Sequence, residues 1–114
     1  MSDTKPTVAV IADDLIWASR LAAAVERAGA RATRNGGQAV IVDLNGRAYD
    51  GLAKVAEAAA TGRPTIAVGQ HEDVELRRRA LAAGALRVYS YNRFFREGPA
   101  LVEKLLAELE PVAR

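Results

Sequence analysis

Short apolar runs alternate along this chain with longer segments in which apolar residues recur at helical spacing. The apolar or alternating runs predict strands at Thr7–Ala12, Ala39–Leu44, Thr65–Val68 and Leu86–Tyr91, and a weaker strand at Ala30–Arg34. The segments of helical spacing predict helices at Asp14–Ala28, Tyr49–Thr61, Glu72–Ala83 and Pro99–Leu109. Strands that alternate with helices indicate an α/β fold with a parallel sheet and helices on both faces.

One connection is too short for a helix. Only about five residues, Arg34 to Gln38, separate the weak second strand from the third, and they contain the turn Asn35-Gly36-Gly37. An extended chain covers about 3.3 Å per residue, so this segment just crosses beside one neighbouring strand. We therefore expect a flavodoxin-like, doubly wound, five-stranded sheet whose second crossover helix is shortened or absent.

Composition narrows the class of protein. The chain has 114 residues, of which half are hydrophobic, so residues 1–114 are expected to form one domain. The net charge of +2 makes nucleic acid an unlikely partner. The absence of cysteine excludes disulfides and thiolate sites. No apolar stretch reaches membrane-spanning length, and residues 1–5 lack the start of a signal peptide, so we expect a cytoplasmic protein that does not act at a membrane.

Acidic residues follow two of the predicted buried strands. Asp43 ends the run Ala39–Val42, and Asp13-Asp14 ends the run that starts at Val8. If the two strands are neighbours, three carboxylates meet at the carboxyl edge of the sheet, where open α/β sheets bind ligands. With an oxygen of Asn45, such a cluster suits Mg²⁺. The alternative is local: Asp13 or Asp14 caps the next helix, and Asp43 begins a turn.

Further landmarks follow these acidic residues in a recognisable order. They are Leu21, Val25-Glu26, Gly29, Asp50-Gly51, Pro64, Asp73, Ala80 and Gly84-Ala85. In order and spacing, this set resembles the receiver domain of two-component response regulators over nearly the whole chain. The resemblance implies a phosphoacceptor at Asp43 and a Mg²⁺ site at Asp13, Asp14 and Asn45.

The sequence departs from that family at two positions that would contact a phosphoryl group. The resemblance implies a hydroxyl residue where Gly69 stands and a lysine where Tyr91 stands. Loss of the lysine removes a charge-assisted hydrogen bond of about 1.5–3 kcal/mol. Arg47 and Arg93 are candidate substitutes for its charge.

The second half of the chain carries a candidate partner face. In receivers, the face formed by the fourth helix, fifth strand and last helix is the usual partner surface, and the residues predicted there are Arg77, Arg78, Tyr89, Tyr91 and Arg93. A sensor kinase or a separate output protein is the expected partner, and a homodimer through this face is left open. The alternative is a solvated helix face on which Asp73 and Glu75 pair with Arg77 and Arg79.

The pattern favours a signalling module over an enzyme, because the chain has neither a phosphate-binding glycine loop nor a Ser–His–Asp set, and His71 is its single histidine. The favoured hypothesis is a pseudo-receiver that acts by protein–protein interaction without the phosphorylation switch. The alternative is a Mg²⁺-dependent receiver phosphorylated on Asp43. A flavodoxin-like binder of small molecules is less favoured, because Asp13-Asp14 has the wrong charge for a phosphate loop.

Overall fold

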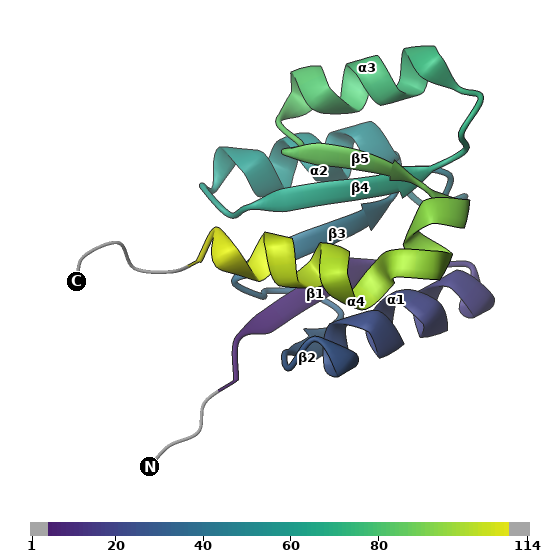
Figure 1. Cartoon of the computed structure of the whole chain (residues 1–114). Coiled ribbons are helices and arrows are strands. Elements are labelled where there is room, and N and C mark those ends of the chain that lie inside the picture. The colour runs from purple at the N-terminus through teal and green to yellow at the C-terminus, as the bar shows by residue number, and fades with distance from the viewer. Residues whose placement is uncertain (1–4, 110–114) are drawn as a thin grey trace.

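A computed structural model describes residues 5–109 as five strands and four helices (Figure 1). Residues 1–4 and 110–114, which belong to the predicted domain and include most of the N-terminal segment considered above, lie outside the described residues. The elements are β1 (Thr7–Ile11), α1 (Leu15–Arg27), β2 (Arg31–Thr33), β3 (Ala39–Asp43), α2 (Gly51–Ala60), β4 (Thr65–Gly69), α3 (Val74–Ala83), β5 (Arg87–Ser90) and α4 (Tyr91–Ala107).

All five strands are parallel, in the order β2-β1-β3-β4-β5. The central strands β3 and β4 are buried along their whole length, as expected for strands covered on both faces. Two apolar clusters sandwich the sheet, one beneath α1 and α4 and the other beneath α2 and α3. The predicted α/β class and receiver-like sheet are thereby confirmed. None of the described helices is long and apolar enough to cross a membrane.

The connection from β2 to β3 contains no helix, as its length predicted. Gly36 and Gly37 adopt positive φ angles of 74° and 72°, which side chains with a Cβ rarely tolerate. A Cβ on Gly37 would lie 2.6 Å from the backbone nitrogen of Ala9. The segment at Gly36-Gly37 therefore packs directly against β1. The backbone N–H of Gln38 then donates to the carbonyl oxygen of Thr7 at 2.8 Å.

Each helix begins at a polar residue whose side chain accepts a backbone N–H. Asp14 accepts from Trp17 at 3.0 Å, Asp50 from Ala53 at 3.2 Å, Asp73 from Leu76 at 3.0 Å and Ser90 from Arg93 at 3.1 Å. Such caps satisfy amides that have no partner within the helix. The local interpretation of Asp14 as a helix cap is confirmed.

The predicted start of the last helix at Pro99 is wrong. The strand ends at Ser90, and α4 runs from Tyr91 to Ala107 with Pro99 in its interior. Proline favours the first position of a helix, which made Pro99 a plausible start. The buried residues of α4 nevertheless include Phe94 and Gly98, at helical spacing before Leu101. A Cβ on Gly98 would lie 3.0 Å from that of Ala24, so glycine lets α4 approach α1 closely.

Gly51 provides a test of how closely the start of α2 packs against the backbone that follows β3. A Cβ on Gly51 would lie 2.8 Å from the Cα and carbonyl oxygen of Leu44, the residue after Asp43. We expect Gly51→Ala to lower the free energy of unfolding by about 1–3 kcal/mol in urea titrations, although alanine favours helices. Gly69→Ala is the matched control, because its added Cβ would make only ordinary contacts from 3.4 Å outward. Equal stability of the Gly51→Ala variant and the unmodified protein would contradict this packing.

Candidate functional site

Asp43 lies at the carboxyl end of β3 and is 2% exposed. The Tyr91 hydroxyl donates a short hydrogen bond to its Oδ1 atom. The same hydroxyl lies 3.1 Å from the Oδ1 atom of Asn45, whose backbone N–H also donates to Asp43 Oδ1 at 3.1 Å. Two donors thus converge on one oxygen of the candidate phosphoacceptor, and Tyr91 covers it.

Tyr91 reaches Asp43 because β5 leads into α4 without a loop. Ser90 ends the strand and caps the helix, so Tyr91 is the first helical residue, and the prediction that it belongs to the strand is wrong. Its ring packs against Trp17 of α1, with 4.6 Å between ring centroids. The hydroxyl is therefore held at the carboxyl edge of the sheet by both its hydrogen bonds and its ring.

A second tyrosine, Tyr49, contacts the backbone at the same edge of the sheet. Its hydroxyl lies 3.0 Å from the carbonyl oxygen of Ile11 and 2.8 Å from that of Asp43, and it donates to these ends of β1 and β3. A Cβ on Gly46 would lie 2.1 Å from the Tyr49 ring, so the ring needs glycine at that position. Sequence reasoning missed this role, and the glycine in the loop after Asp43 is the only signal of it.

The acidic pair serves the surrounding backbone. Oδ2 of Asp13 accepts the N–H groups of Arg47 at 3.0 Å and Ala48 at 2.6 Å, and so ties the loop after β3 to the end of β1. Asp14 is occupied as the cap of α1. Both aspartates line a pocket of about 400 Å³ together with Asn45 and Arg47. The structure thus brings the predicted metal ligands to one edge, although Asp43 does not line this pocket.

The arrangement fits a divalent cation poorly. One oxygen of Asp13 already accepts two backbone amides, Asp43 is covered by Tyr91, and Arg47 adds positive charge to the pocket. Within residues 5–109, no three carboxylate or histidine side chains are close enough together to hold a metal ion. The Mg²⁺ site at Asp13, Asp14 and Asn45 stays a prediction.

Burial governs the protonation of the site. Loss of solvent raises the pKa of Asp43 above its ordinary value, which the hydrogen bond from Tyr91 partly offsets, and the charges of Asp14 and Asp13 raise it further. Burial and the bond to Asp43 raise the pKa of Tyr91 as well. Tyr91 therefore stays a neutral hydrogen-bond donor across the physiological pH range.

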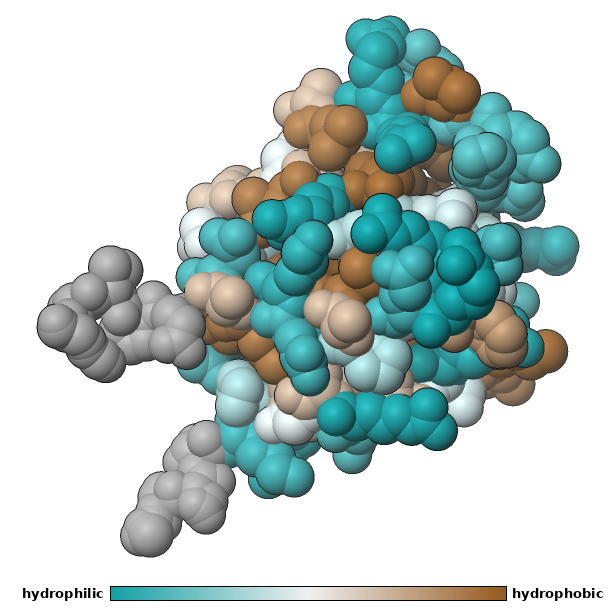
Figure 2. Space-filling view, viewed as in Figure 1, coloured by the Kyte–Doolittle hydropathy of each residue, from teal (hydrophilic) through white to brown (hydrophobic). Residues whose placement is uncertain are grey.

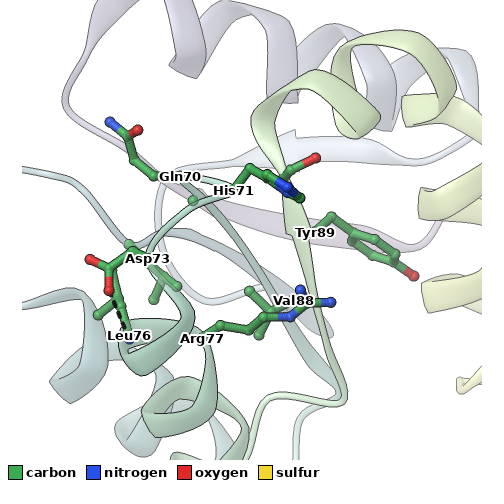
Figure 3. A pocket seen from close by; sticks show the side chains of 10 residues that line it. Gln70, His71, Asp73, Leu76, Arg77, Val88 and Tyr89 are labelled. Carbon is green, nitrogen blue, oxygen red and sulfur yellow. Dashed lines mark hydrogen bonds between the residues drawn. The ribbon is translucent and has the colours of Figure 1, made fainter.

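The structure separates the residues predicted for the partner face. Arg77 and Arg78 are exposed on α3 and Arg93 on α4, whereas Tyr89 is only 5% exposed and Tyr91 belongs to the site around Asp43. In Figure 3, Arg77 extends towards Val88 of β5, and the Tyr89 ring turns away from this small pocket. His71 lines the same pocket from the loop after β4.

Ion pairs on this face differ in part from those the local interpretation predicted. Glu75 pairs with Arg79 at 3.4 Å, as expected, and also with Arg78 at 2.7 Å. Asp73 caps α3, and within residues 5–109 no ion pair joins it to Arg77. Arg93 pairs with Glu97 at 3.3 Å. Figure 2 shows mainly hydrophilic side chains over the outer side of α4.

The fold matches solved receiver structures. The Francisella response regulator 1452 receiver domain aligns with a TM-score of 0.75 at 18% identity, over 92% of this chain and 99% of that one. The BeF3-activated receiver domain of DrrB, a response regulator of Thermotoga maritima, aligns with a TM-score of 0.79 at 16% identity, over 91% of this chain and 99% of that one.

A third match is a Burkholderia pseudomallei response regulator with a phosphorylated aspartic acid and a calcium ion. It aligns with a TM-score of 0.68 at 17% identity, over 98% of this chain and 78% of that one. No protein-family model and no curated protein sequence matches the chain. At these identities the likeness establishes a receiver-like fold.

Two tyrosine variants test the hydrogen bond to Asp43. Tyr91→Phe leaves a buried carboxylate with one donor fewer, so we expect the free energy of unfolding at neutral pH to fall by about 1.5–3 kcal/mol. Tyr89→Phe is the matched control, because within the described residues the buried Tyr89 hydroxyl has no hydrogen-bond partner. Removal of the Tyr89 hydroxyl should leave the free energy of unfolding unchanged or raise it slightly. Urea titration measures both, and equal losses would argue against a special role for Tyr91.

Replacement of Asp43 tests the raised pKa. A carboxyl group whose pKa is higher in the folded than in the unfolded state contributes stability at low pH, and this is lost as the pH rises through the folded pKa. Relative to the unmodified protein, Asp43→Asn should therefore gain stability from about pH 4 upwards, where an ordinary aspartate ionises. Melting temperatures of the two proteins between pH 3 and pH 8 measure this gain. A difference that is constant over this range would contradict it.

Proposed function

We propose that this protein is a receiver-like signalling module that acts by protein–protein contact without a phosphorylation switch. The observation that carries the proposal is the hydrogen bond of the Tyr91 hydroxyl to Asp43, which occupies the position expected for an incoming phosphoryl group. The chain is proposed to have no catalytic activity of its own.

Phosphoryl transfer to an aspartate needs an accessible carboxylate oxygen and positive groups that offset the crowded negative charge. Asp43 is buried, and a neutral phenol stands where a lysine would supply charge. Gly69 offers no hydroxyl to follow a phosphoryl group, and this removes the movement by which receivers of the resembled family switch. The burial of Asp43 and the missing lysine act against phosphoryl transfer, and the missing hydroxyl acts against the switch that would follow, so both differences support the proposal.

The partner face is proposed to consist of Arg77, Arg78 and Arg93, which are exposed on α3 and α4. Their charge suits an acidic surface on a sensor kinase or a separate output protein. A homodimer through the same face is the alternative that sedimentation would detect. Nucleic acid is less suitable, because the net charge of the chain is only +2.

A second candidate function is that of a receiver phosphorylated on Asp43. It is favoured by the placement of Asp13, Asp14 and Asp43 at one edge of the sheet. In that case Tyr91 would have to leave Asp43 before the reaction, with Mg²⁺ bound by Asp13, Asp14 and Asn45.

Amide NMR with Mg²⁺ and then Mg²⁺ plus beryllofluoride, a mimic of aspartyl phosphate, distinguishes these functions. We expect no shift of the α3 and β5 amides at millimolar concentrations, because Tyr91 denies the mimic its position. Shifts at Asp43 and Gly69 that spread into α3 and β5 would establish the phosphorylation switch and overturn the proposal.

A double variant, Gly69→Ser with Tyr91→Lys, controls for an insensitive assay. The space beside Gly69 accepts a Cβ, so the serine should fit. We expect this variant to gain a response to beryllofluoride, and expect Asp43→Asn in the same background to abolish it. A double variant that folds but stays silent would mean that Gly69 and Tyr91 are not what blocks the site.

A further inference from the structure

The missing crossover helix leaves a particular place on the sheet uncovered. The chain moves in the same direction from β2 to β3 as from β3 to β4 and from β4 to β5. Because parallel crossovers are right-handed, a helix between β2 and β3 would lie on the face that carries α2 and α3. Here that place holds only the flat segment 34–38. The part of β1 beside α2 is therefore without helical cover.

One hollow lies at this place, and a second adjoins it at the carboxyl edge of the sheet. The first, of about 240 Å³, lies between α2 and the 34–38 segment, with Lys54, Glu57 and Ala58 on its α2 side. The other, of about 590 Å³, lies at the carboxyl end of β1 and is lined mainly from the α1 face, by Leu15, Ala18 and Ala22 of α1. Ile11 and Arg34 line both hollows. We call the two together the crossover groove.

The groove combines an apolar floor with a basic rim. Its larger hollow is lined by apolar residues of β1 and α1, among them Leu15, which at 85% exposed is the most exposed large hydrophobic residue described. Exposure on this scale costs free energy that a partner would recover by covering it. The apolar lining therefore favours contact with a protein partner over contact with water.

The charged residues that line the two hollows are Arg34, Lys54 and Arg63 against Glu57 and Asp13, so basic residues are in small excess. Arg34, Lys54 and Arg63 line the smaller hollow against a single carboxylate, that of Glu57, which lies 3.7 Å from Lys54. Arg63 donates to the carbonyl oxygen of Gly36. Within residues 5–109 no carboxylate lies within ion-pair distance of Arg34. The rim is thus suited to an acidic partner.

We propose that the crossover groove binds an amphipathic helix of a partner protein, with acidic residues along one side. Such a helix lies where the two hollows meet at Ile11 and Arg34, beside the place that a crossover helix would fill. Its apolar side contacts Ile11 and Leu15, and its carboxylates reach Arg34 and Lys54.

This surface is separate from the face proposed above. The groove lies by β1 and β2, whereas Arg77 and Arg78 lie beside β5, and β2 and β5 are opposite edges of the sheet. One molecule is therefore able to hold two partners at once. The inference does not depend on whether Asp43 is phosphorylated, so a beryllofluoride response would leave it standing.

The test is selection from a displayed library of helical peptides whose apolar positions are fixed at i, i+3, i+4 and i+7 and whose other positions vary. We expect the peptides enriched on the unmodified protein to be acidic on one side. Synthetic copies should bind in calorimetry at least tenfold more weakly to Arg34→Glu and to Leu15→Ser. Both residues are exposed, so these variants should fold.

Arg77→Glu is the matched control, because it reverses an exposed arginine outside the groove and should leave the affinity unchanged. Amide NMR of the complex should move the signals of Ile11, Arg34 and Lys54. Lack of enrichment, enrichment without acidic preference, or equal binding by Arg34→Glu would overturn the proposal. Peptides that lose affinity only with Arg77→Glu would place the binding site on the other face instead and also overturn it.

Discussion

The buried carboxylate of Asp43 is the constraint around which this edge of the sheet is organised. An ionised carboxylate without solvent is costly unless donors surround it, and here Tyr91 and the Asn45 amide are its donors. Because β5 leads into α4 without a loop, Tyr91 is placed to donate its hydroxyl to Asp43. The ring also joins α4 to α1 through Trp17. The candidate phosphoacceptor is thus buried and hydrogen-bonded within this edge of the sheet.

Much of the fold follows from the sequence because its signals are local. The apolar runs ending at Asp13 and Asp43, the cap at Asp14, and the five-residue connection each depend on a few adjacent residues. The start of α4 was missed because it depends on distant contacts. Phe94 and Gly98 pack against residues far earlier in the chain, and those contacts outweigh the local preference of Pro99 for a helix start.

The candidate site was predictable in its members but only partly in their roles. The strand pattern placed Asp13, Asp14 and Asp43 at one edge, and the family resemblance put Tyr91 at the position of a lysine. It did not reveal that Asp13 binds the backbone of the 43–48 loop, or that Tyr49 reaches the ends of two strands. Such roles depend on the direction in which a side chain points. That direction is set by neighbours that carry no functional group, such as Gly46, which leaves room for the Tyr49 ring.

The two departures from a standard receiver shape have a common physical logic. Tyr91 fills the position of a charged group with a neutral one, and the segment at Gly36-Gly37 replaces a helix with backbone laid on β1. The first fixes the edge of the sheet that would respond to phosphorylation, and the second uncovers apolar surface beside β1 that a helix would otherwise bury. On the proposed function, a fold without a phosphorylation switch and with an exposed groove is better suited to holding partners than to changing shape, and this favours a constitutive docking role.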